Sequence, residues 1–221
     1  MIKIKRSSKQ ITVAVIAILL CFIAAVKALS SITTVIFKDE YSVCIDPGHG
    51  GNADGAVADS RKRLEKDDNL ALSLKVRDEL EKMGVKVIMT RETDKDVSLK
   101  ERCKIANKAK VDLFVSIHRN SSLDGTGMEV WIKDKPSNAE KKLANDILTS
   151  LVKCSGEKNR GVKSGYRNSS GNNYYVNANT NMTSCLVEVG FISNSSDNKD
   201  FDRLIDTYAK SIAQAIYDNI K

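Results

Sequence analysis

The sequence predicts a single α/β domain in which helices cover both faces of a central, largely parallel sheet. Short runs rich in Val, Ile and Leu alternate with longer amphipathic segments, a pattern typical of strand–helix–strand units in a parallel sheet. The chain has 221 residues and a hydrophobic fraction of 42%. This length supports one sizeable core and is too short for two domains of ordinary size.

The expected elements follow in order after residue 40. Short apolar runs predict strands at 41–45, 85–90, 111–117, 127–132 and 183–191. Apolar residues at helical spacing predict helices at 67–83, 98–108, 137–151 and 197–220. Ser137 and Glu140 have the spacing of a capping box. The stretch 155–172 is rich in Gly, Asn and Lys and predicts an irregular loop.

The first 30 residues differ from the rest in composition. They contain no acidic residue, and a basic start precedes an uncharged apolar run at 11–26. This order is typical of a signal sequence or signal anchor, although sixteen residues are fewer than the roughly 20 that span a bilayer. We predict that residues 1–30 are a signal peptide or transmembrane anchor, that 31–40 is a linker, and that the folded domain covers 41–221. Whether the segment is cleaved is left open.

The formal charge of +7 falls to +2 without the five basic residues of this segment. A nearly balanced domain lacks the charge excess of a surface that binds phosphates, and this disfavours a nucleic-acid binder. Export permits disulfides, but the cysteines are widely spaced and form no C-x-x-C metal pattern. Cys44 and Cys185 lie in apolar runs and are predicted to be core residues; cysteine pairing is left open.

Both histidines of the chain follow predicted strands. His49 comes four residues after the first strand, in "DPGHGG", and His118 comes directly after the third. Ligands gather at the carboxyl ends of parallel strands, although structural histidines also occur there. Glu188 interrupts the apolar run of the last strand. A buried carboxylate needs a cation, a metal or a catalytic role; an outward-facing position is the alternative.

Two imidazoles and one carboxylate are a common ligand set for catalytic zinc, with a fourth position open for water. The candidate carboxylate ligands are Asp46, Asp54, Glu65 and Glu188. A second acid must stay free to accept the proton of the water. The residue pattern alone does not rank these four acids.

A series of separated motifs resembles, in order, those of the zinc-dependent N-acetylmuramoyl-L-alanine amidases: "VCIDPGHGG", "LEKDDN", "GVKVIMTRETD", "DLFVSIHRN", "GMEV", "RGVK" and "LVEVGFISN". The resemblance covers about residues 41–220. It implies a zinc enzyme that cleaves the amide bond between N-acetylmuramic acid and L-alanine in peptidoglycan. It also implies that His49, Glu65 and His118 bind the zinc and that Glu188 is the catalytic acid.

A lone catalytic domain behind an anchor most resembles the sporulation amidases, which strip stem peptides so that muramic lactam forms in the spore cortex. The resemblance implies a role in sporulation and germination, in the forespore envelope or elsewhere outside the cytoplasmic membrane. Its partners would be peptidoglycan, the membrane through the first 30 residues, and an accessory protein. The alternatives are a zinc peptidase that cuts within the stem peptide and a non-catalytic wall-binding module.

Two features depart from the family pattern. Arg119 stands where the family usually has a small residue. It either contacts carboxylates of the stem peptide, with Asn120 as a second substrate contact, or points to solvent, which we favour. The stretch "NNYYVNANTNMTSC" is more polar than in relatives, which puts the local substrate contacts in doubt.

Several other residues are given structural roles. The glycines of "DPGHGG" predict a tight turn rather than a phosphate loop, because the P-loop ending is missing. A structural network is favoured for Arg91, Asp94, Arg102 and Asn107, and Asn194 is predicted to cap the last helix.

Asp46 either orients a histidine or forms a turn before Pro47. Trp131, Tyr174 and Tyr175 are sugar-stacking candidates, although core positions are the more common place for aromatic residues on strands.

Overall fold

The computed structural model describes residues 17–27, 41–58, 63–166 and 172–221, in two separate units. In the first unit, residues 17–27 form a helix with exposed side chains. The rest of the predicted export segment and linker, 1–16 and 28–40, lies outside the described residues. In the part of the chain that is described, no helix has both the length and the apolar character needed to cross a membrane.

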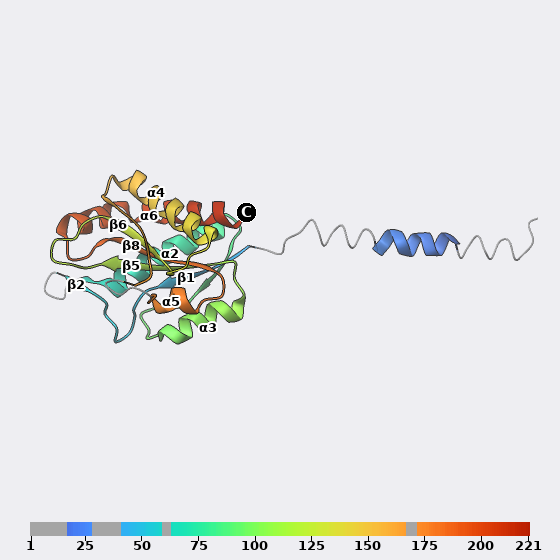
Figure 1. Ribbon diagram of the computed structural model, residues 1–221, viewed down its shortest axis with the longest axis horizontal. Helices are drawn as coiled ribbons and strands as arrows, with labels where there is room; N and C mark the ends of the chain where they lie inside the picture. Colours follow the sequence, from blue (N-terminus) through green and yellow to red (C-terminus); the bar gives the residue numbers. More distant parts are fainter. Residues whose placement is uncertain (1–16, 28–40, 59–62, 167–171) are drawn as a thin grey trace, which may run out of the picture. The chain divides into compact units, whose positions relative to one another are not determined.

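A six-stranded sheet forms the centre of the second unit, Glu40–Lys221, in the order β4-β1-β5-β8-β6-β7 (Figure 1). Its strands are β1 (Ser42–Pro47), β4 (Lys86–Met89), β5 (Leu113–Asn120), β6 (Met128–Ile132), β7 (Asn159–Ser164) and β8 (Thr183–Phe191). All neighbouring strands in the sheet are parallel except β6 and β8. The prediction of a largely parallel sheet is therefore confirmed.

Helices cover both faces of this sheet, as predicted. One face carries α2 (Glu65–Lys82), α4 (Asn138–Ser155) and α6 (Ser195–Ile220); the other carries α3 (Leu99–Ala109) and the short α5 (Tyr175–Asn179) (Figure 1). The capping box of Ser137 and Glu140 is present. The side chain of Asn194 accepts hydrogen bonds from two backbone N–H groups at the start of α6, so this cap is also confirmed.

Successive strand residues point to opposite faces of the sheet, and the two faces differ in chemistry. The face under α2, α4 and α6 is apolar throughout, with Val43, Ile45, Val115, Ile117, Val130, Val187 and Val189 among its buried residues. The face under α3 and α5 has an apolar part, formed by Cys44, Phe114, Trp131 and Leu186. Towards the carboxyl ends of β1, β5 and β8 it becomes polar, with Asp46, His118 and Glu188.

The structure corrects the prediction in three places. The expected loop 155–172 contains β7, although 167–171 lies outside the described residues. Strand β5 continues to Asn120, so that His118 lies within the strand rather than after it. Helix α5 and a small ribbon of β2 (Val57–Ala58) and β3 (Arg63–Leu64) were not predicted.

The cysteines of the described residues are all free thiols. Cys44 and Cys185 are fully buried, which confirms that they are core residues. Burial raises the pKa of both thiols, because the charged thiolate is disfavoured in an apolar environment.

Candidate metal centre

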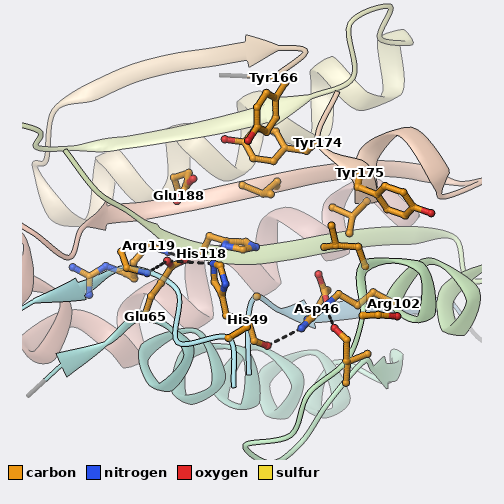
Figure 2. Close-up of a pocket in the computed structure, with 18 of the residues that line it drawn as sticks. Asp46, His49, Glu65, Arg102, His118, Arg119, Tyr166, Tyr174, Tyr175 and Glu188 are labelled. Carbon is orange, nitrogen blue, oxygen red and sulfur yellow. Dashed lines mark hydrogen bonds and ion pairs between the residues drawn. The ribbon is translucent and has the colours of Figure 1, made fainter. Parts of the chain in front are cut away.

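His49, Glu65 and His118 converge at the carboxyl ends of β1 and β5 (Figure 2). His118 Nδ1 lies 2.9 Å from Glu65 Oε1, and His49 Nε2 lies 3.3 Å from Glu65 Oε2. One nitrogen of each imidazole and one carboxylate oxygen all lie within 4.8 Å of one another. The three residues therefore form a group that can hold a metal ion.

A turn after β1 sets the position of His49. His49 has a φ of 61°, in the left-handed region that non-glycine residues rarely adopt, and Gly50 and Gly51 follow with φ of 128° and 57°. A Cβ on Gly48 would lie 2.2 Å from the ring of His118. The prediction of a tight turn is confirmed, and the glycine before His49 also leaves room for the second histidine.

Two buried arginines hold the backbone of this turn. Arg91 donates to the carbonyls of Pro47 and Gly48, at 3.0 and 2.9 Å. Arg102 donates to the carbonyls of Pro47 and His49, at 2.7 Å each. These contacts confirm the structural role predicted for both arginines, and they fix a backbone conformation that would otherwise be strained.

Asp46 anchors Arg102, and the hydrogen bonds of its carboxylate within the described residues go to groups other than the histidine rings. Its carboxylate accepts hydrogen bonds from Arg102 at 2.7 Å, Thr90 at 2.6 Å and Ser116 at 2.7 Å. Burial raises the pKa of Asp46, but the charge of Arg102 and these hydrogen bonds outweigh it and hold the pKa below its ordinary value. Asp46 therefore positions Arg102, which in turn donates to the carbonyl of His49.

Glu65 is the first residue of α2, and its carboxylate is fixed by several donors. Oε2 accepts from the N–H of Ala56 at 2.8 Å, and Oε1 accepts from the N–H of Arg119 at 3.2 Å. Burial raises the pKa of Glu65, but its hydrogen bonds with His118 and His49 dominate and hold the pKa well below its usual range. Glu65 is thus an ionised carboxylate between two imidazoles.

Asp54, the remaining ligand candidate, and the two residues predicted to be structural, Asp94 and Asn107, make contacts away from the histidines. Asp54 pairs with Lys66 at 3.0 Å, and Asp94 pairs with the same lysine at 3.1 Å. Asn107 bonds the backbone of Asn179 and Asn181. The structural roles predicted for Asp94 and Asn107 are therefore confirmed, and Glu65 is the acid that meets both histidines.

Glu188 lies directly across from His118, because these two residues are paired in the register of β5 and β8. Paired residues of neighbouring strands point to the same face, so both side chains reach the same open region (Figure 2). The residue is 5% exposed and lines a cavity of about 770 Å³ that also contains His49, Glu65 and His118. Glu188 is an acid of this cavity outside the group of three residues that can hold a metal ion.

Aromatic side chains form another wall of this cavity. Tyr166, Tyr174 and Tyr175 line it, and the ring of Tyr174 meets those of Tyr166 and Trp131 edge-on, with centroids 4.8 and 5.4 Å apart. Trp131 is buried in the core, as expected, whereas Tyr175 is half-exposed. Tyr166 was not predicted as a site residue, since it lay in an expected loop.

The expectation that Arg119 points to solvent is wrong. Arg119 is 2% exposed, donates to Asp68 at 2.5 Å and to Asn198 at 2.8 Å, and lies over the ring of Phe201. Asn120 is also buried and donates to Glu129. Both side chains are held within the protein, and their contact with substrate stays a prediction.

Comparison with known proteins identifies the family. Residues 43–221 match the Amidase_3 family model, described as N-acetylmuramoyl-L-alanine amidase. This chain belongs to the N-acetylmuramoyl-L-alanine amidase family. It is 31% identical to the germination-specific N-acetylmuramoyl-L-alanine amidase of Bacillus subtilis over 196 residues, which cover 80% of this chain and 77% of that amidase. It is 35% identical to the amidase LytC of the same species, but covers 34% of that longer relative.

Solved structures agree with this assignment. The N-acetylmuramoyl-L-alanine amidase of Clostridium difficile 630 is similar with a TM-score of 0.75 and 33% identity, over 82% of this chain and 97% of that chain. The CwlD amidase of Clostridioides difficile, solved in complex with the GerS lipoprotein, gives a TM-score of 0.69 at 32% identity, over 82% and 96% of the two chains. The motif resemblance found in the sequence is therefore confirmed.

Proposed function

We propose that this chain is a zinc-dependent amidase that hydrolyses the bond between N-acetylmuramic acid and L-alanine in peptidoglycan. The observation that carries the proposal is the convergence of His49, Glu65 and His118 beside Glu188, in one open cavity of a chain of this family. Fold alone does not determine chemistry, so the proposal rests on these side chains.

The three converging residues fit zinc. Two imidazoles and a carboxylate are a common donor set for catalytic zinc, which keeps a fourth position for water or substrate. The side chain of His49 is 33% exposed and that of His118 is 18% exposed, so the group opens into the cavity. Zinc held there supplies a Lewis acid that activates water and polarises the scissile carbonyl.

The chain itself supplies the proton transfer. Glu188 accepts the proton of the attacking water and passes it to the leaving amine of L-alanine, acting first as general base and then as general acid. Its place opposite His118 in the sheet keeps it beside the ligands. The N–H groups of Ala56 and Arg119 hold the Glu65 carboxylate in place.

The cavity is large enough for part of a glycan strand and its stem peptide. Its aromatic wall of Tyr166, Tyr174 and Tyr175 offers ring faces and edges to a sugar. We assign the glycan to this wall.

The proposed setting is the outer side of the cytoplasmic membrane, with the first 30 residues as export segment or anchor. A role in the spore cortex or in germination is supported by the similarity to the germination-specific amidase. The complex of the similar CwlD amidase with a lipoprotein supports an accessory protein as a partner. Production confined to the developing spore would support the sporulation role, and vegetative production would argue against it.

The test is a peptidoglycan digestion by the full-length chain, with zinc or with a chelator. We expect zinc-dependent appearance of N-terminal alanine, intact glycan strands, and one bound metal per chain. New N-termini at other stem-peptide residues would instead identify a zinc peptidase. Binding to the wall with neither bound zinc nor a new N-terminus would identify a non-catalytic module, whereas bound zinc without cleavage would point to the accessory protein as a requirement.

A further inference from the structure

A second cavity adjoins the metal centre. It has a volume of about 270 Å³, and its lining includes Glu129, Arg160, Lys163 and Phe191. Ser121 lines both this cavity and the larger one, so the two cavities are neighbours at that residue. No step of the amidase mechanism described above uses this second cavity.

The pairing of residues on neighbouring strands places the second cavity on the same face of the sheet as His118 and Glu188. His118 pairs with Glu188 across β5 and β8, and Glu188 pairs with Glu129 across β8 and β6. Paired residues lie on the same face of a sheet, so these three side chains form a row. The next strand is β7, which carries Arg160 and Lys163.

Glu129 holds the two cations of β7. Its Oε2 accepts hydrogen bonds from Arg160 Nε at 2.8 Å and from Lys163 Nζ at 2.6 Å. Burial raises the pKa of Glu129, but Lys163 and Arg160 outweigh it, so the carboxylate stays ionised. Within β6 and β7, one carboxylate therefore faces two cations, and the next acid in the row, Glu188, lies on β8.

Both cations keep hydrogen-bond donors for a ligand. The Arg160 guanidinium lies over the ring of Phe191, 4.8 Å from its centroid. Arg160 Nη1 donates to a carbonyl at 3.4 Å, and within the described residues Nη2 donates to no group. The Lys163 ammonium has three N–H groups, and Glu129 accepts one. The side chains of Arg160 and Lys163 are 28% and 33% exposed, an arrangement suited to a carboxylate.

We propose that this cavity binds the carboxylate of the second stem-peptide residue, a D-glutamate whose α-carboxyl is free in some peptidoglycans and amidated in others. This proposal rests on the amidase function above. Neighbouring Cα atoms lie about 3.8 Å apart and neighbouring strands about 4.8 Å. A peptide that crosses the sheet from a scissile bond at Glu188 therefore passes roughly one strand per residue. L-Alanine then lies over β6, and the D-glutamate lies over β7, beside Arg160 and Lys163.

Two matched substrates test this subsite: N-acetylmuramoyl-L-alanyl-D-glutamate and its α-carboxamide, each with the γ-carboxyl of the glutamate capped as a methylamide so that only the α-position differs in charge. We expect the full-length zinc-loaded chain to have about tenfold higher kcat/KM for the acid, the size of one charge-assisted hydrogen bond. The released peptides, L-alanyl-D-glutamate and its α-carboxamide with the same γ-methylamide cap, provide a second readout. Their dissociation constants, measured by calorimetry, should differ in the same direction without any turnover.

Variants test which residues cause the preference for the acid substrate. Arg160→Gln and Lys163→Gln should each bring the acid-to-amide ratio close to one, whereas Arg160→Lys keeps the charge and should retain most of the preference. Lys153→Gln removes the same charge from an exposed position in α4 and should leave the ratio unchanged. A merely structural role of Arg160 would lower activity on both substrates equally and leave the ratio intact.

Failure of the subsite and failure of the amidase function give different results. Equal kcat/KM and equal dissociation constants for acid and amide would overturn the subsite, while turnover of both substrates leaves the amidase function standing. If neither substrate is cleaved, the amidase function fails, and the calorimetric comparison of the two peptides decides the subsite by itself.

Discussion

The two faces of the central sheet differ in chemistry: one is apolar along its whole length, and the other is apolar at one end and polar at the other. Under α2, α4 and α6 the strands present an uninterrupted apolar surface. Under α3 and α5 the apolar surface stops before the carboxyl ends of β1, β5 and β8, where Asp46, His118 and Glu188 lie on the same face. Among the described residues, the cavities at this end of the face are lined by the candidate metal ligands, by Glu188, and by Arg160 and Lys163 of β7.

Residues next to each other in the sequence therefore belong to different parts of the molecule. Ile117 is fully buried in the apolar core, and His118 is a ligand candidate in the cavity. Val187 and Glu188 repeat this division in β8. Because side chains alternate along a strand, a rigid apolar face can hold the polar face in position without contributing to its chemistry. Substitutions at adjacent positions should then separate stability from activity.

The largest expected effect is that of Glu188→Gln, which removes a proton acceptor and keeps the size of the side chain. We expect kcat to fall by about 10²- to 10⁴-fold, the usual contribution of a general base, with the zinc content unchanged. Single-turnover kinetics and metal analysis measure the two quantities. Val187→Ala is the matched control on the opposite face: it should lower stability and leave kcat per folded molecule near that of the wild type. Near-normal kcat in Glu188→Gln would refute its assigned role.

Asp46→Asn should give the next largest effect, because it leaves Arg102 as a buried cation with only neutral partners. Breaking a buried ion pair typically costs about 3–5 kcal/mol of unfolding free energy. Asp206→Asn breaks the exposed pair with Lys75 and should cost less than about 1 kcal/mol. Urea denaturation at pH 7 measures both. Equal effects of the two variants would contradict the contrast between buried and exposed pairs.

The pH dependence of the Asp46 effect has a definite sign. The folded-state pKa of Asp46 lies below the ordinary value of 3.8. The ionised carboxylate therefore stabilises the fold fully at pH values above 3.8, and this stabilisation is lost as the pH falls through the folded-state pKa. The difference between wild type and Asp46→Asn should thus be constant from pH 7 to about pH 5 and shrink below pH 4. A difference that grew on acidification would contradict an ionised Asp46.

Gly48→Ala tests how closely the turn and the cavity are coupled. The new Cβ would lie 2.2 Å from His118 Cε1, so the imidazole cannot keep its present position beside Glu65. We expect zinc affinity to fall by about 10- to 100-fold, as when a supporting contact of a ligand is lost, with little change in the unfolding free energy of the zinc-free chain. Competition with a chromophoric chelator measures the affinity. Unchanged affinity would show that the ligand group tolerates this displacement.

The apolar face and the helices were the predictable part of the fold. Local signals such as the capping box of Ser137 and Glu140, or the cap at Asn194, determine where helices begin, and the sequence contains them directly. Strand β7 escaped prediction because it lies at the sheet edge, with the polar sequence NRGVKS. A strand of this kind has no apolar alternation, although the family motif "RGVK" marked the segment.

The polar face was less predictable, because its contacts join distant residues. Arg119 can be buried because its guanidinium donates hydrogen bonds to Asp68 of α2 and Asn198 of α6. The residue pattern offered four candidate acids, and the selection of Glu65 depends on where α2 begins relative to β5. The resemblance to the amidases already implied Glu65 as the third metal ligand. Local sequence patterns indicate candidate site residues, but contacts between distant segments determine which candidates come together.

The smallest expected effect is that of Ile117→Val, which removes one methylene group next to His118 but on the apolar face. Such a change typically costs about 0.5–1.5 kcal/mol of unfolding free energy. Zinc affinity and kcat should stay at wild-type values, because the side chain of Ile117 points away from the cavity into the core shared with α2. Denaturation and chelator competition on the same preparation measure both effects. Loss of zinc affinity in this variant would mean that repacking of the core shifts β5 and with it His118, so that the two faces would not be separable.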